Sequence, residues 1–185
     1  GRTVLFVGRL LPHKGPDVLI EAARPSWQVR LVGSALDQRY LSDLNRLAEG
    51  KSVRFDHGAD DAALEAAYQS AAVVVVPSLP RDRYGAVTPV AELLGLVAIE
   101  AGARGIPVVA SNTASLPEIV VDGVTGFLVP PGDVGALRER VDAVLSDEPL
   151  RRRLGEAARR HVTERFSWRA AAAVAIDTYR RICSQ

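Results

Sequence analysis

Short apolar segments alternate with longer amphipathic segments along most of this chain, and that alternation restricts the folds open to it. Strands that are apolar at nearly every position are typical of parallel sheets covered on both faces. The pattern predicts an α/β fold with a doubly wound, Rossmann-like parallel sheet of about six strands. The expected strands are 3–7, 28–32, 52–55, 73–76, 108–110 and 126–129, and the helices between them are 16–23, 37–49, 60–70, 96–104 and 115–120.

Helices alone are expected after Asp133, which suits a helix N-cap. These helices form a C-terminal helical tail and span 134–145, 150–164 and 168–183. For Trp168, Ile176 and Tyr179 in the last helix, two outcomes are open: they cap the core or form an exposed patch. For Trp168 we expect the first.

Composition narrows the range of partners. The chain of 185 residues is 48% hydrophobic with a formal net charge of +1, which predicts one globular domain and no nucleic-acid partner. Its single cysteine, Cys183, excludes an intrachain disulfide and fits a reducing compartment. The apolar run 71–76 is far shorter than the roughly 18 residues of a membrane span, so no transmembrane segment is expected. Because the chain has no methionine and begins almost directly in a strand, we interpret it as a piece of a longer protein.

The turn after the first expected strand combines Gly8, Arg9, His13 and Lys14. Glycine permits close backbone approach to a ligand, and the two cations precede a helix whose N-terminus carries partial positive charge. Together they predict an anion site at a strand's carboxyl end. The turn matches neither the dinucleotide fingerprint nor a phosphate-binding P-loop. The alternative is a polar turn with two solvated cations.

Two glutamates, Glu92 and Glu100, flank a segment that is otherwise apolar. A charge in such surroundings either reaches solvent or meets a partner that needs a carboxylate. If a helix begins near Gly95, Glu92 precedes it and Glu100 lies inside it. A separation of eight residues is about 12 Å in a helix. That span suits a ligand with a hydroxyl-bearing ring at each end and negative charge between them, which is the layout of a nucleotide-diphosphate sugar.

Taken in order, these motifs closely resemble the C-terminal half of retaining GT-B glycosyltransferases of family 4. The resemblance covers essentially the whole chain and rests on the motifs Gly8-Arg9-Leu10, Lys14-Gly15, Val76-Pro77-Ser78, Glu92 with Gly95-Leu96-Val97 and Glu100-Ala101, Gly105-Ile106-Pro107, Leu116-Pro117-Glu118, and Gly123 with Gly126-Phe127. It implies one half of a GT-B fold, in which 1–185 is the nucleotide-sugar donor-binding domain. The N-terminal acceptor domain is then absent from this chain and is an expected partner.

The resemblance also implies roles for individual residues. Arg9 and Lys14 match the basic pair that holds the donor diphosphate and stabilises its charge as it leaves. Glu92 matches the glutamate beside the donor sugar, and Glu100 matches the one that binds the nucleotide ribose. Further substrate contacts are expected from Gly8 and His13 in the turn, from the backbone of Leu94, Gly95, Leu96 and Val97, and near the base from Ala59 and Asp61.

The implied reaction transfers a sugar from a nucleotide-diphosphate donor to an acceptor with retention of the anomeric configuration, without a metal or a cofactor. We expect the fragment alone to be inactive. The expected location is cytoplasmic, and the missing domain allows for peripheral attachment to a membrane.

Alternatives are a GT-B-fold nucleotide-sugar epimerase or phosphorylase, and a non-catalytic nucleotide-sugar-binding module. A dinucleotide oxidoreductase ranks lower because its glycine fingerprint is missing. Two features depart from the family pattern. Leu94 stands where the family usually has phenylalanine, and the loop at 79–91 is longer than usual, with Arg81, Asp82, Arg83 and Tyr84 inserted. We expect these four residues near the donor sugar.

Overall fold

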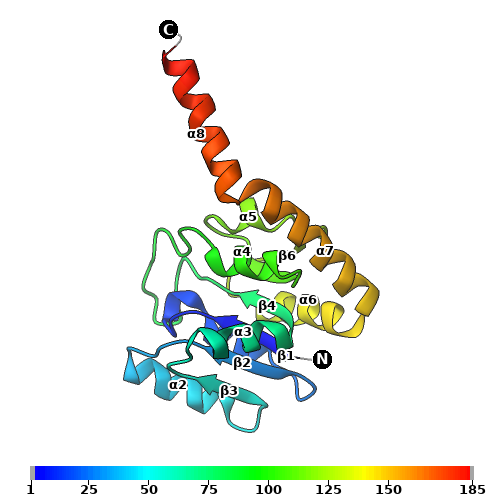
Figure 1. The fold of residues 1–185 in the computed structure, drawn as a ribbon. Helices are drawn as coiled ribbons and strands as arrows, with labels where there is room; N and C mark the ends of the chain where they lie inside the picture. Colours follow the sequence, from blue (N-terminus) through cyan, green and yellow to red (C-terminus); the bar gives the residue numbers. More distant parts are fainter. Residues whose placement is uncertain (1–2, 184–185) are drawn as a thin grey trace.

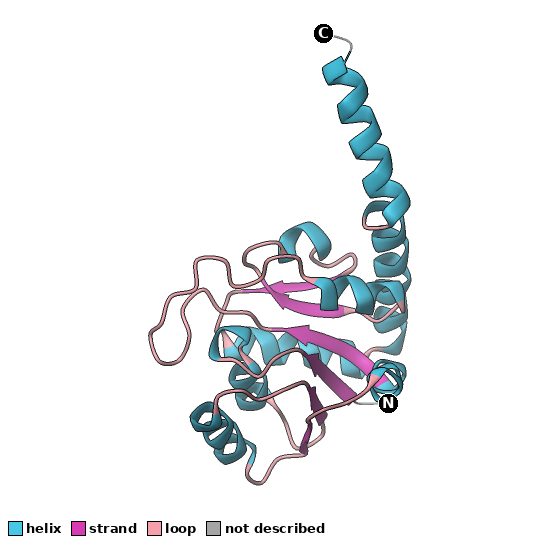
Figure 2. Cartoon of the chain, turned by 60° about the vertical axis from the view of Figure 1, so that its left-hand side comes forward, coloured by secondary structure: helices cyan, strands magenta, loops and turns pink. Residues whose placement is uncertain are grey.

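The computed structural model describes residues 3–183, and its centre is a six-stranded sheet (Figure 1 and Figure 2). All of the strands run parallel, in the order β3-β2-β1-β4-β5-β6. The chain starts in the middle of the sheet and moves outward twice, which confirms the predicted doubly wound fold. The strands are β1 (Thr3–Val7), β2 (Gln28–Val32), β3 (Val53–Asp56), β4 (Ala71–Val76), β5 (Val108–Ser111) and β6 (Gly126–Val129).

Helices cover both faces of the sheet and enclose two apolar cores. Side chains of one strand alternate between these cores: Val4 and Phe6 belong to one, and Leu5 belongs to the other. The first core includes α1 (Pro16–Ala22), α2 (Gln38–Ala48) and α6 (Val134–Ser146), and the second includes α3 (Asp61–Ser70), α4 (Leu96–Ala103) and α5 (Leu116–Ile119). The last core helix, α7 (Glu148–Arg165), packs against α4 and β6. Coverage of both faces leaves the carboxyl ends of the strands as an open edge.

Observed element boundaries differ from the predicted ones by a few residues, for local reasons. Helix α7 begins two residues early because the Asp147 side chain accepts a hydrogen bond from the Leu150 amide at 2.8 Å and caps it. Strand β4 begins at Ala71, where it already pairs with Thr3 of β1. A short 3-10 helix, η1 (Pro12–Lys14), occupies the turn after β1 and was not predicted.

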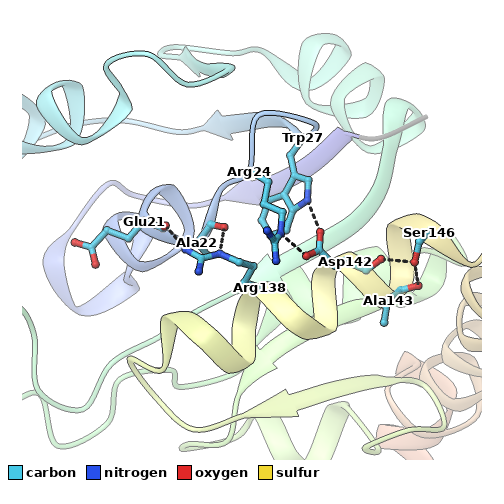
Figure 3. A network of polar contacts seen from close by, with 8 residues as sticks. All are labelled: Glu21, Ala22, Arg24, Trp27, Arg138, Asp142, Ala143 and Ser146. Atoms are coloured by element: carbon cyan, nitrogen blue, oxygen red, sulfur yellow. Dashed lines mark hydrogen bonds and ion pairs between the residues drawn. The ribbon is translucent and has the colours of Figure 1, made fainter.

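Polar contacts between α1 and α6 fix the helix that follows this turn (Figure 3). Arg138 donates hydrogen bonds to the carbonyl oxygens of Glu21 and Ala22, each at 2.9 Å. These carbonyls lie in the last turn of α1, where no intrahelical donor is available. One helical turn along α6, Asp142 accepts a hydrogen bond from the indole nitrogen of Trp27 at 2.8 Å. The C-terminal end of α1 is therefore held, while its N-terminal end faces the open edge of the sheet.

The last helix, α8 (Trp168–Cys183), extends away from the body of the protein (Figure 1, red). None of its described residues is buried, and Trp168 is 92% exposed, so the expectation that Trp168 caps the core is wrong. The helix contacts α7 and leaves the body, so the side chain of Trp168 has no apolar surface to cover. Ile176 and Tyr179 are exposed as well, which favours the alternative of an exposed patch. Across residues 3–183, no helix combines the length and apolar character needed to cross a bilayer.

Candidate functional site

A cleft of about 370 Å³ opens at the carboxyl ends of β1 and β4, the two central strands. This is the point where the strand order reverses, and in open α/β sheets ligands bind at such a point. Its walls come from the turn after β1, from the end of β4, from the loop before α4 and from the first turn of α4. Segments far apart in the sequence therefore converge on one opening.

The turn after β1 is locked against the segment that follows β4. The carbonyl oxygen of His13 accepts a hydrogen bond from the Leu79 amide at 2.8 Å. Gly15 has φ +67°, and a Cβ atom built on it would lie 2.1 Å from the carbonyl oxygen of Pro77. Only glycine fits this contact, because the conformation is left-handed and the neighbouring atom belongs to the backbone. The contact holds Lys14, the residue before Gly15, next to the carboxyl end of β4.

Lys14 and Glu92 form an ion pair in the cleft. The Lys14 ammonium lies 2.8 Å from Glu92 Oε2, and the two side chains are 20% and 15% exposed. Ser78 donates to the same carboxylate oxygen at 3.4 Å, and the Ser115 hydroxyl donates to the Glu92 carbonyl oxygen at 3.2 Å. These contacts fix the end of a long loop. They place a cation and a carboxylate side by side in a partly desolvated site, where electrostatic interactions are stronger than in bulk water.

The cleft also receives the N-terminus of α4. Gly95 is the N-cap of this helix and has a left-handed conformation with φ +60°, and a Cβ atom there would lie 2.4 Å from Ile119 Cδ1. Leu96 and Val97 follow and line the cleft. As the first residues of a helix, they carry amide groups without an intrahelical acceptor. Together with the helix dipole, these amides favour negative charge in the cleft.

His13 lies beside the two cations of the turn. Burial lowers the pKa of His13, and the nearby positive charges of Lys14 and Arg9 lower it further. The imidazole is therefore neutral at physiological pH and does not add to the positive charge of the turn. In that state it offers one donor and one acceptor to a ligand.

Most of the site residues predicted from the sequence lie together. The cleft is lined by Gly8, Arg9, His13, Lys14, Glu92, Leu94, Leu96 and Val97. Gly95 does not line the cleft; it is buried as the N-cap of α4, directly before Leu96. Three other predicted residues also do not line this cleft: Glu100, Ala59 and Asp61. Ala59 lies in the turn before α3, and Asp61 is the first residue of that helix, after the N-cap Asp60.

Glu100 is exposed on α4, one helical turn beyond Val97. The sequence left two outcomes open for this residue, and the structure combines them. Its carboxylate reaches solvent, and Oε2 accepts a hydrogen bond from the Tyr68 hydroxyl at 2.8 Å. Residues three apart on a helix are neighbours on its surface, so Glu100 continues the line of the cleft wall beyond Val97.

Sequence reasoning assigned no role to Ser78, Ser115 or Tyr68. Ser78 had a usable signal, since it is a small polar residue just beyond a fully apolar strand and is completely buried. Ser115 and Tyr68 had none. They act through contacts with residues 23 and 32 positions away, which a local pattern does not encode.

The long loop between β4 and α4 is attached at its tip to the helices of the neighbouring face. Arg83 lies 3.5 Å from a carboxylate oxygen of Asp17 in α1, and Tyr84 donates a hydrogen bond to Asp43 in α2. The Tyr84 ring packs edge-on against Tyr40, with 6.1 Å between the ring centroids. Residues 81–84 were expected near the donor sugar, but they do not line the cleft. Residues 90–94 line it instead.

The carboxylate under this loop makes stability depend on pH. Burial raises the pKa of Asp17, although hydrogen bonding from the Tyr40 hydroxyl at 2.5 Å opposes the shift. The folded protein then binds this proton more tightly than the unfolded chain does. Asp17 therefore contributes most stability below its unfolded pKa of about 4, and that contribution is lost as pH rises through its raised pKa.

We expect the free energy of unfolding of Asp17→Asn to rise relative to that of the wild type as pH increases from about 4 towards 8. The variant has no carboxyl to ionise, so it does not lose the stability that the wild type loses. Urea denaturation across this range measures the difference. Asp43→Asn is the control with opposite sign, and its difference from wild type is followed below about pH 4. The Tyr84 hydrogen bond lowers the pKa of Asp43, so its contribution is lost as pH falls. A constant difference between Asp17→Asn and wild type contradicts the prediction.

Known proteins resemble this chain in sequence and in structure. The model of the family described as glycosyl transferases group 1 matches residues 1–161. A D-inositol 3-phosphate glycosyltransferase of Corynebacterium diphtheriae is 36% identical over 184 residues, which cover 92% of this chain and 40% of that protein.

Solved structures show the same similarity. Sucrose-phosphate synthase from Thermosynechococcus elongatus has a TM-score of 0.79 at 34% identity, covering 98% of this chain and 45% of its own. The Anabaena protein HepE in complex with UDP has a TM-score of 0.79 at 27% identity, covering 100% of this chain and 49% of its own. The chain thus spans less than half the length of each of these three proteins.

Proposed function

Because this chain belongs to the glycosyl transferases group 1 family, we propose that it is the nucleotide-sugar donor-binding domain of a retaining glycosyltransferase. In this proposal residues 1–185 hold the donor, and an N-terminal GT-B domain supplies the acceptor. The observation that carries the proposal is the Lys14–Glu92 pair, at 2.8 Å, inside a cleft at the reversal point of the sheet. The chain alone then binds a nucleotide but performs no transfer.

The diphosphate of the donor is assigned to the basic end of the cleft. Arg9 and Lys14 lie there, and Leu96 and Val97 of the first turn of α4 line the same opening. Arginine offers a planar fork of donors to phosphate oxygens, while lysine offers a compact charge. The UDP named with the Anabaena structure, which matches the entire chain, supports a nucleoside diphosphate as the ligand class.

The reaction assigned to the complete enzyme breaks the bond between the anomeric carbon and the donor phosphate oxygen. The acceptor hydroxyl forms a new bond on the same face of the sugar, and its proton passes to the departing phosphate. Negative charge grows on that phosphate, where Arg9, Lys14 and the helix N-terminus are already in place. Preorganised groups of this kind usually supply the largest share of catalysis. Glu92 lies beside the sugar and stabilises its positive charge.

The nucleoside is assigned to the far side of Val97. Glu100 accepts hydrogen bonds from the ribose hydroxyls, as a carboxylate with free lone pairs can. The base lies near Ala59 and Asp61, in and just after the turn that leads into α3. Gly8, His13, Leu94 and Gly95 complete the contacts along the diphosphate and sugar.

Calorimetric titration of the chain with UDP, GDP, ADP and dTDP tests this assignment. We expect saturable 1:1 binding of at least one of the four, and weaker binding of the corresponding monophosphate because it lacks one charged group. Arg9→Ala should weaken the diphosphate complex. Arg54→Ala removes an exposed arginine at the opposite, amino-terminal half of the sheet and serves as the control. Failure of all four diphosphates to bind at millimolar concentration contradicts the proposal.

A product assay separates the transferase from its alternatives. In a protein that joins this chain to its acceptor domain, a labelled nucleotide sugar should yield a glycosylated acceptor of unchanged anomeric configuration. An epimerised nucleotide sugar or a sugar phosphate as product points to the epimerase or the phosphorylase. Full function of Glu92→Ala in that protein points to a non-catalytic binding module.

A further inference from the structure

Tyr68 links the two helices that border the nucleoside end of the proposed site. Its side chain is 1% exposed in α3, and its hydroxyl donates to Glu100 Oε2 in α4 at 2.8 Å. A buried hydroxyl needs a partner, and here that partner is an exposed carboxylate. The other oxygen of Glu100, Oε1, has no hydrogen-bond partner within the described part of the chain, residues 3–183. The carboxylate is thus held at one oxygen and open at the other.

Arg104 clamps both members of this contact. Its guanidinium lies 4.4 Å from the centroid of the Tyr68 ring, and it donates to the Glu100 backbone carbonyl at 3.0 Å. The Arg104 guanidinium also forms an ion pair with the Glu65 carboxylate, with 2.7 Å between Nη2 and Oε2. The Glu100 carboxylate is therefore bonded to a neutral hydroxyl rather than to a cation.

The protonation state of Tyr68 supports a fixed role as donor. Burial raises the pKa of the Tyr68 hydroxyl, and the hydrogen bond to Glu100 raises it further. The hydroxyl is therefore protonated at physiological pH. Its proton always points to Oε2, which fixes how the carboxylate is turned.

We propose that Tyr68 is a positioning residue that turns the Glu100 carboxylate so that its open oxygen accepts hydrogen bonds from the vicinal hydroxyls of a bound ribonucleotide. This rests on the proposed function and deepens it, since it makes the Tyr68–Glu100 contact the source of selectivity for ribose. A carboxylate free to rotate loses part of this selectivity to the entropy of ordering it. Burial of Tyr68 removes that freedom before the ligand arrives.

The test compares Tyr68→Phe with wild type in calorimetric titrations against UDP and 2′,3′-dideoxy-UDP. We expect wild type to prefer UDP by about 10-fold or more, the usual range for hydrogen bonds to a charged group. In Tyr68→Phe this preference should shrink severalfold, through weaker binding of UDP. The affinity for 2′,3′-dideoxy-UDP should stay unchanged, because that ligand has no hydroxyl for Glu100. GDP and its dideoxy form replace this pair if GDP is the nucleotide that binds.

Tyr40→Phe is the matched control. Tyr40 is also fully buried, and its hydroxyl also donates to a carboxylate, Asp17, at 2.5 Å. Its contact lies on the other face of the sheet. Both variants should lower the melting temperature, but only Tyr68→Phe should change the preference for UDP over its dideoxy form.

Each outcome has a distinct reading. If wild type binds neither nucleotide of either pair, the proposed function fails. If wild type binds UDP with no preference over the dideoxy form, or if Tyr68→Phe keeps the full preference, the inference about Tyr68 is overturned while diphosphate binding stands. Equal loss of preference in Tyr40→Phe also overturns it, because the effect is then a general consequence of destabilisation.

Discussion

Lys14→Ala is expected to weaken binding of UDP to the chain by roughly 10- to 150-fold, the equivalent of about 1.5–3 kcal/mol for a hydrogen bond to a charged group. Two effects add in this variant. The diphosphate loses a positive partner, and Glu92, whose side chain is 15% exposed, loses the cation 2.8 Å away and repels the ligand. In a protein with both domains, turnover should fall by about 100- to 1000-fold, as when a group that stabilises developing negative charge is removed.

Titration with uridine, which has no phosphate, gives an internal control for this variant. Its affinity should not change, because Lys14 is assigned to the diphosphate. Lys51→Ala is the matched control, since Lys51 is also partly buried and donates to a carbonyl oxygen, that of Ile20, at 2.7 Å. An equal loss for uridine, or for Lys51→Ala, contradicts the role given to Lys14. Adding Glu92→Gln to Lys14→Ala should restore part of the UDP affinity, since the repelling charge is then gone.

Gly15→Ala should lower the free energy of unfolding by about 3 kcal/mol, more than the other substitutions considered for stability. Alanine in the left-handed region costs about 1 kcal/mol by itself. The rest comes from the Pro77 carbonyl oxygen, which would lie 2.1 Å from the new Cβ atom. Relief of this clash requires the turn to move away from the end of β4. That movement breaks the contact between His13 and Leu79 and separates Lys14 from Glu92.

Gly50→Ala isolates the effect of backbone conformation. Gly50 has φ +72°, close to that of Gly15, and no heavy atom lies within 4 Å of the position that a Cβ atom would take there. It should lose only about 1 kcal/mol. Urea denaturation of both variants measures the difference. Similar losses for the two glycines show that the packing against Pro77 contributes nothing.

The sequence predicted the sheet because its signal is local. Most strands are short apolar runs, and several helices start at a capping aspartate, such as Asp133, so the order of elements follows from short windows. The line of cleft residues was also predictable in part. Gly8, Arg9 and Lys14 follow one central strand and Glu92 follows the other, and parallel strands bring their carboxyl ends to the same edge.

Contacts between distant segments were not predictable. The position of Tyr84 against α2 depends on how a loop folds over the sheet, and its sequence resembles that of any polar loop. Tyr68 has the pattern of an ordinary core aromatic in an amphipathic helix, and its hydroxyl acquires a role only because α4 packs beside it. The prediction that Trp168 is buried was wrong. A large apolar side chain favours burial, but Trp168 lies in α8, which extends away from the body of the protein.

Attachment of Arg83 and Tyr84 to α1 and α2 divides the excursion between β4 and α4 into two arcs. The two arcs are paired with each other near the tip, where the Thr88 amide donates to the Pro80 carbonyl oxygen at 2.8 Å and Arg81 bridges to Val87 in an antiparallel arrangement. The second arc supplies residues 90–94 of the cleft wall, so a change in these residues reshapes the cleft without altering a strand of the sheet.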